Sequence, residues 1–132
     1  MRVLVLGNDL LAQRLSSTLG VDGIEVAHLV ELPLALDLIR QDKFDLVVVD
    51  NLIENVDIIC NCIYGLACTP VVLILEESEA DWRMMSNFKV DGFLPKEASD
   101  KELRARVKAA CYRPVNSSRL GLMDSAGLIK SN

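Results

Sequence analysis

The sequence lacks any hydrophobic stretch long enough to cross a bilayer, although 51% of its 132 residues are hydrophobic. We also expect no signal peptide, since only a few apolar residues separate Arg2 from Asn8 and Asp9. These absences argue against a membrane protein and a secreted one, and they predict a soluble, cytoplasmic protein. The length suits one domain that buries a single core without disulfides or structural metals.

Cysteine is scarce, and its four positions do not form a convincing metal motif. Cys60, Cys62 and Cys68 lie close together, and Cys111 stands apart. On a helix, residues two apart point to different sides, and no histidine lies near this group. We therefore expect reduced, partly buried thiols rather than a zinc site.

Positive charge is also in short supply, with 14 Lys and Arg against 19 Asp and Glu and a net charge of −5. This balance argues against nucleic acid as a direct partner of the whole chain. The charge is uneven, because residues 101–132 are basic whereas residues 1–100 are strongly acidic. The basic end indicates either a solvated helix face followed by a tail, or a connection to something else.

Five apolar runs of strand length alternate with helical patterns along the chain. The predicted strands span 2–6, 24–28, 46–49, 71–75 and 91–94. Their continuous apolar character is typical of a parallel sheet that is covered on both faces by helices. We predict an α/β domain over residues 1–113 and a linker or tail over 114–132, after Pro114.

The helical patterns supply the expected caps and buried faces. Asp9 is the predicted N-cap of the first helix, and Ser99 with Glu102 forms a capping box for the last. Pro33 is placed near the start of the second helix, and the third and fourth are expected at 54–66 and 79–88. The residues expected to face the core are Leu11, Leu15, Leu19, Leu32, Leu36, Ile39, Ile59, Ile63, Leu66, Leu103, Val107 and Ala110.

Polar residues follow several of the predicted strands. Ligands of open α/β sheets bind outside the carboxyl ends of the strands. The residues at those ends are Gly7, Asn8 and Asp9, then Asp50 and Asn51, then Leu75 and Glu76, and finally Lys96. A functional site is therefore expected at this edge, with Asp50 and Lys96 close together.

Three segments in order resemble one family. FDLVVVD, ending at Asp50, is similar to the third strand of response-regulator receiver domains, and MRVLVLGNDLLAQRL to their first strand and helix. DGFLPKEAS resembles their fifth strand, in which an aromatic residue (Phe93) precedes a lysine (Lys96) by three positions. The resemblance implies a flavodoxin-like, CheY-like (βα)5 sandwich with a five-stranded parallel sheet in the order 2-1-3-4-5. It also implies a signalling domain rather than an enzyme.

The resemblance implies that Asp50 accepts a phosphoryl group from a histidine kinase. The family pattern makes Lys96 a catalytic cation and Phe93 a switch aromatic. Mg²⁺ would be held by acids after the first strand, by Asp50 and by the backbone carbonyl of Leu52. Metal and lysine are needed because they neutralise charge on the transferring oxygens.

The sequence departs from that pattern at three places. Gly7 and Asn8 replace the acidic pair, with Asp9 one residue late. The position of the usual hydroxyl falls on Leu75, or on Glu76 in a shifted register, and neither can donate a hydrogen bond to a phosphate. The loop after Asp50 is short and lacks a Pro-Gly turn.

These departures predict no bound cofactor, or weak Mg²⁺ at Asn8, Asp9, Asp50 and Leu52. We expect a pseudo-receiver in which Asp50 pairs with Lys96. The alternative is a conventional receiver that is phosphorylated at Asp50 by a sensor kinase.

The segment GFLPKEAS is closest to receivers that precede a LuxR/NarL-type DNA-binding domain. We therefore expect transcription regulation, with DNA bound only through a domain absent from these residues. Other protein domains and a homodimer are the expected partners, without membrane contact. The dimer would use the fourth helix, fifth strand and fifth helix, or the first and fifth helices. The fourth helix carries Trp82, Met84, Met85 and Phe88, which suit a partner surface.

A small Rossmann-type nucleotide-binding domain is a further alternative. Gly7 and Ala12 match only part of the dinucleotide fingerprint, and His28 stands where an acid is expected, with Glu31 later. His28 has no obvious catalytic partner, which favours a structural role at the end of its strand.

Overall fold

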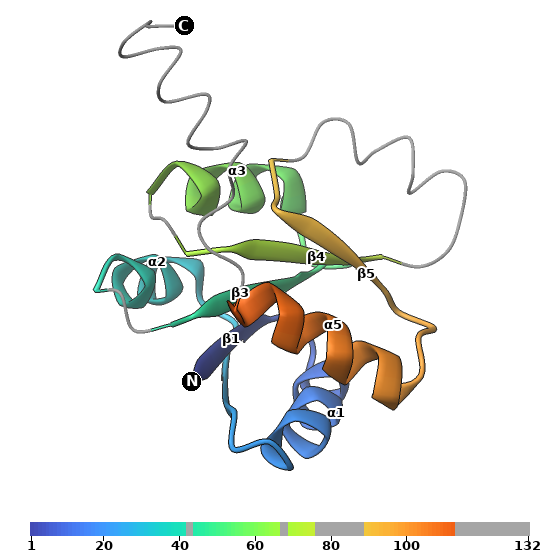
Figure 1. Ribbon diagram of the computed structural model, residues 1–132. Helices are drawn as coiled ribbons and strands as arrows, with labels where there is room; N and C mark the ends of the chain where they lie inside the picture. Colours follow the sequence, from blue (N-terminus) through green and yellow to red (C-terminus); the bar gives the residue numbers. More distant parts are fainter. Residues whose placement is uncertain (42–43, 67–68, 76–88, 113–132) are drawn as a thin grey trace, which may run out of the picture.

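The computed structural model describes residues 1–41, 44–66, 69–75 and 89–112 (Figure 1). Five parallel strands form one sheet in the order β2-β1-β3-β4-β5, which confirms the predicted flavodoxin-like, CheY-like α/β architecture. The strands are β1 (Arg2–Leu6), β2 (Glu25–Leu29), β3 (Leu46–Asp50), β4 (Val71–Leu75) and β5 (Gly92–Pro95). The helix predicted at 79–88 and the tail predicted at 114–132 lie outside the described residues.

Helices cover both faces of the sheet (Figure 1). The helices are α1 (Asp9–Gly20), α2 (Leu32–Arg40), α3 (Val56–Leu66) and α5 (Asp100–Tyr112). The first and last pack on one face, and α2 and α3 pack on the other. Successive residues of β1, β3 and β4 point into alternate layers, so these three strands are apolar apart from Arg2 at the start of β1 and Asp50 at the end of β3.

The predicted buried faces of the helices are largely confirmed. Leu11, Leu15 and Leu19 are buried on α1, Ile59 and Ile63 on α3, and Leu103 and Val107 on α5, with Ala110 packed against the same core. On α2, Ile39 is buried as predicted, but Ala35 takes the central buried position and Leu36 is only half-buried. The side chains of Leu32 and Leu66 are not described.

Several element boundaries differ from the predicted ones by one or two residues, and β3 extends one residue further, to Asp50. The second strand begins at Glu25 instead of residue 24, since the Ile24 N–H is still bonded to the Leu19 carbonyl at the end of α1. The third helix begins at Val56 because Asn55 has a positive φ of 55°, outside the helical region. The last strand spans Gly92–Pro95, one residue later than predicted.

The predicted N-cap of α1 is wrong by one residue. Asn8 is the N-cap, and its Oδ1 accepts a 2.8 Å hydrogen bond from the Leu11 N–H. Asp9 is instead the first helical residue, where its charge faces the positive end of the helix dipole. At α5 the Ser99 Oγ accepts from the Glu102 N–H as predicted, whereas the Glu102 carboxylate pairs with Arg106.

Among the helices described, none combines the length and the apolar character needed to cross a bilayer.

Candidate functional site

The carboxyl ends of the strands gather the predicted site residues at one edge of the sheet. Asp50 is the last residue of β3, and Lys96 immediately follows β5. The Lys96 Nζ lies 3.2 Å from the Asp50 Oδ1 and donates a hydrogen bond to it. The topology therefore brings together two groups that are 46 residues apart in the chain.

Asp50 is a buried carboxylate, with only 1% of its side chain exposed. Its Oδ1 also accepts a 3.1 Å hydrogen bond from the N–H of Leu52. A buried carboxylate is costly unless a countercharge and hydrogen bonds compensate for lost hydration, and Lys96 and Leu52 provide both.

Gly7 packs directly against this carboxylate. A Cβ built on Gly7 would lie 2.8 Å from the Asp50 Cβ and 3.3 Å from the Leu11 side chain. Only glycine fits this approach without a shift of the neighbouring atoms. The position just before Asn8 therefore has no space for an acidic side chain in this arrangement.

Of the residues predicted to hold Mg²⁺, Asn8 and Asp50 line one pocket together with Lys96, whereas Asp9 lines a separate one beside His28. The Asn8 Oδ1 is used as the cap of α1, and the Asp9 carboxylate lies 3.4 Å from the His28 Nδ1 on the neighbouring strand. Leu52 contributes its N–H to Asp50. Across the described ranges, no group of three or more His, Cys, Asp or Glu side chains could hold a metal ion. The donor set therefore does not fit a hard cation that needs several oxygen ligands.

The remaining site residues lie on β4 and β5. Leu75 is buried at the end of β4, so an aliphatic side chain stands where the receiver pattern has a hydroxyl. Phe93 is half-buried on β5, opposite Leu73, and packs against the core on the α2 and α3 side. Glu76 lies outside the described residues.

Sequence reasoning missed Arg14, which joins α1 to the loop after Lys96. Its Nε lies 2.8 Å from the Asp100 Oδ1, and its Nη1 donates a 2.9 Å hydrogen bond to the Lys96 carbonyl. Its Nη2 donates to the Ala98 carbonyl. No local pattern reveals these contacts, because the partners lie more than 80 residues away.

His28 has a structural contact that agrees with the role predicted for it. Its Nε2 lies 2.6 Å from the Gly7 carbonyl. Because a carbonyl can only accept, Nε2 carries the hydrogen and the ring fixes the β1–α1 loop beside Asp50.

Among the residues that the structure describes, the cysteines do not form a common site. Cys60 is buried and Cys62 is exposed, so the two side chains of the Cys-x-Cys motif point to different environments. Burial, with a smaller contribution from Asp57, raises the pKa of Cys60 to about 12. The pKa of Cys111 rises to about 11, mainly through burial. Cys68 lies outside the described residues.

No family model matches this sequence, and no curated protein matches it. Solved structures do resemble it. The receiver domain of a signal transduction histidine kinase from Syntrophus aciditrophicus has 22% identity and a TM-score of 0.72, over 83% of this chain and 89% of that one. A two-component response regulator from Clostridium difficile has 22% identity and a TM-score of 0.67, over 85% and 95%.

The chemotaxis protein CheY4 of Vibrio cholerae is also similar, with 19% identity and a TM-score of 0.66 over 83% of this chain and 97% of that one. At such low identity the likeness concerns the course of the chain rather than the residues of the site. This chain has the fold of the response-regulator receiver domain.

Proposed function

We propose that this chain is an atypical receiver domain, a pseudo-receiver that transmits signals through protein contacts rather than through phosphoryl transfer at Asp50. One observation carries the proposal. Gly7 packs against Asp50 and leaves no space for an acidic side chain there, and the next residue, Asn8, carries no charge and caps α1.

Charge explains why this arrangement opposes phosphoryl transfer. Attack by a carboxylate on a phosphoryl group requires positive charge on the transferring oxygens, which a metal ion and a lysine together supply. Here Lys96 lies beside Asp50 as the family pattern requires, but Asn8 and Asp9, on the metal-binding side, are engaged in a helix cap and a contact with His28. Mg²⁺ affinity is therefore weak or absent in this proposal.

The loss of a hydroxyl at the end of β4 supports the same conclusion. In the family pattern, a hydroxyl at that position bonds the new phosphate and pulls its loop inward. The buried Leu75 side chain cannot do so, and this would break the link between Asp50 and the switch aromatic Phe93.

The proposal includes a cytoplasmic, non-enzymatic protein that regulates transcription through an attached or partner DNA-binding domain. Its expected partners are other protein domains, among them a sensor kinase that binds without transferring phosphate. A homodimer would form through α5 and β5 with the helix predicted at 79–88, or through α1 and α5, which pack side by side.

The test is incubation of the full chain with Mg²⁺ and acetyl phosphate, followed by intact-mass measurement. We expect no gain of one phosphoryl group, with Asp50→Ala as the matched control and a receiver that has the acidic pair as the positive control. A phosphoryl adduct that is lost in Asp50→Ala would support the conventional receiver and overturn the pseudo-receiver proposal.

A further inference from the structure

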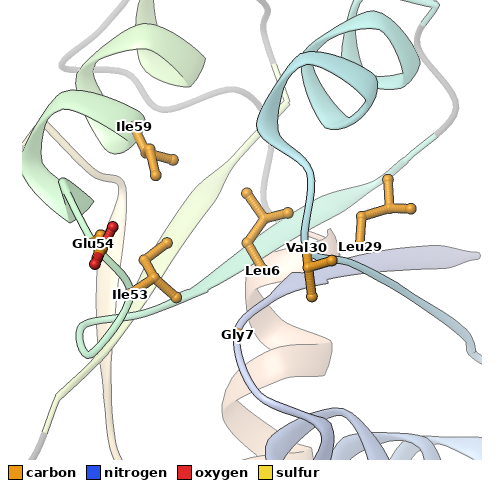
Figure 2. A pocket seen from close by; sticks show the side chains of 7 residues that line it. All are labelled: Leu6, Gly7, Leu29, Val30, Ile53, Glu54 and Ile59. Carbon is orange, nitrogen blue, oxygen red and sulfur yellow. The ribbon is translucent and has the colours of Figure 1, made fainter.

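A cavity lies at the same edge of the sheet, and the proposed function does not use it. Its volume is about 360 Å³, and it opens between the ends of β1 and β2 and the loop that leads into α3 (Figure 2). Leu6 and Ile59 form a buried apolar wall, while Leu29 and Ile53 are partly exposed. The volume lies near the lower end of the range of small-molecule sites, which is about 300–1,000 Å³.

The topology places this cavity where open α/β sheets bind ligands. The chain passes from β1 to β2 on one side and then to β3 on the other, so strand order reverses at β1. A crevice outside the carboxyl ends forms at such a reversal. The backbone of Gly7 lines the cavity at this point.

The cavity exposes apolar side chains to solvent. Val30 lines it with 80% of its surface exposed, although it is an aliphatic residue directly after β2. In Figure 2 the side chains of Val30, Leu6, Ile53 and Ile59 surround one space, to which three separate segments of the chain contribute. An apolar ligand of suitable size would remove this surface from water.

Charge at the cavity selects the kind of ligand. Glu54 is its one ionisable lining side chain within the described residues. The segments that form the mouth, 29–34 and 51–57, also contain Glu31 and Asp57 but no lysine or arginine. The nearby cations at the edge are paired elsewhere, Lys96 with Asp50 and Arg14 with Asp100. The side-chain charge at the mouth is therefore negative and favours a cation over an anion.

We propose that this cavity binds a small amine that has an apolar, ring-sized body. The body would lie between Leu6, Ile53 and Ile59, and the ammonium group would face the carboxylate of Glu54. The inference goes beyond the proposed function and does not depend on whether Asp50 accepts phosphate.

Three indole probes that share a ring and differ in charge test this proposal. Tryptamine is a cation, indole-3-ethanol is neutral, and indole-3-acetate is an anion. Each is titrated into the isotopically labelled full chain, and amide shifts are followed by NMR. We expect saturable shifts at Gly7, Val30 and Ile53 with tryptamine, about fivefold weaker binding of indole-3-ethanol, and still weaker binding of indole-3-acetate.

Two variants with matched controls locate the binding. Val30→Trp should fill the mouth and abolish the tryptamine shifts, whereas Val21→Trp, at an equally exposed valine in the turn after α1, should leave them unchanged. Glu54→Gln should remove most of the preference for tryptamine over indole-3-ethanol. Glu25→Gln, at the opposite end of β2, should retain that preference.

The proposal is overturned by any of three results. These are an absence of saturable shifts with tryptamine, binding of indole-3-acetate as tight as that of tryptamine, or tryptamine shifts that survive Val30→Trp. A dispersed spectrum of each variant shows that it is folded, and Glu54→Gln alters only an exposed side chain. The phosphoryl-transfer experiment is read at Asp50 by mass, so failure of either proposal leaves the other intact.

Discussion

At the scale of single residues, the site is defined by the close approach of Gly7, Asp50 and Lys96. The sequence predicted the meeting of Asp50 and Lys96 from their positions after parallel strands. It showed glycine at position 7, where the receiver pattern has an acid, but not that the close approach of the Asp50 Cβ requires glycine there. The substitution and the burial of Asp50 are thus parts of one arrangement.

Replacement of Gly7 tests this close contact. Gly7→Ala places a methyl group 2.8 Å from the Asp50 Cβ, and we expect a loss of about 1–3 kcal/mol in the free energy of unfolding. Gly20→Ala is the control, because a Cβ there meets no atom within 4 Å and alanine favours the helix. Urea unfolding measures the free energy of unfolding of both variants. Equal stability of Gly7→Ala and Gly20→Ala would argue against the close contact of Gly7 with Asp50.

A double-mutant cycle tests the pairing of Asp50 with Lys96. Lys96→Gln alone should cost about 3 kcal/mol, because it leaves a buried carboxylate without its countercharge. The double variant Asp50→Asn, Lys96→Gln should be more stable than the sum of the single effects predicts, with a coupling of about 1–3 kcal/mol. Additive losses in urea unfolding would mean that the two groups do not interact.

At the scale of elements, the strands followed their apolar runs closely, whereas helix starts depended on single backbone and side-chain contacts. Asn8 rather than Asp9 caps α1, and the positive φ of Asn55 delays the start of α3. Both residues are short polar side chains that suit caps and turns. Composition alone did not distinguish the capping residue from its neighbour.

Arg14 links two elements, and its removal should loosen the loop that carries Lys96. Arg14→Gln loses charge-assisted hydrogen bonds to the Lys96 and Ala98 carbonyls, and we expect a cost of about 1–3 kcal/mol. Hydrogen exchange should become faster at residues 96–100 but not at β1. The neighbouring exposed variant Gln13→Ala should change neither measurement, and unaltered exchange in Arg14→Gln would exclude the bracing role.

At the scale of the whole molecule, the sheet is covered on both faces and its carboxyl edge carries all the polar chemistry discussed above. The same architecture supports many functions, so the likeness to receiver domains fixes the fold while the site must be argued from its own residues. The buried ion pair and the apolar cavity lie at one edge because parallel strands end there together.

Because the thiol of Cys60 is buried, the free energy of unfolding should depend on pH in the alkaline range. Its pKa is raised from 9.0 to about 12 in the folded protein, so the native state holds this proton more tightly than the unfolded chain. The stabilisation is complete below about pH 9 and is lost as the pH rises toward about 12.

Urea unfolding across that interval should therefore show a steeper decline for the natural sequence than for Cys60→Ala. The exposed Cys62→Ala variant should retain the steep decline. If the two stability curves, for the natural sequence and for Cys60→Ala, were parallel, the pH dependence could not be attributed to the raised pKa of Cys60.

The sequence by itself determined the five strands, the alternation with helices and the edge on which Asp50 and Lys96 lie. Continuous apolar runs encode the strands and apolar periodicity encodes the helices, because both depend on residues close together in the chain, and the common edge follows because parallel strands end together. Only the tertiary structure decided the contact of Gly7 with Asp50, the bracing by Arg14 and the cavity beside Glu54. Those features depend on distances between segments far apart in the chain, which are fixed only when both faces of the sheet are packed.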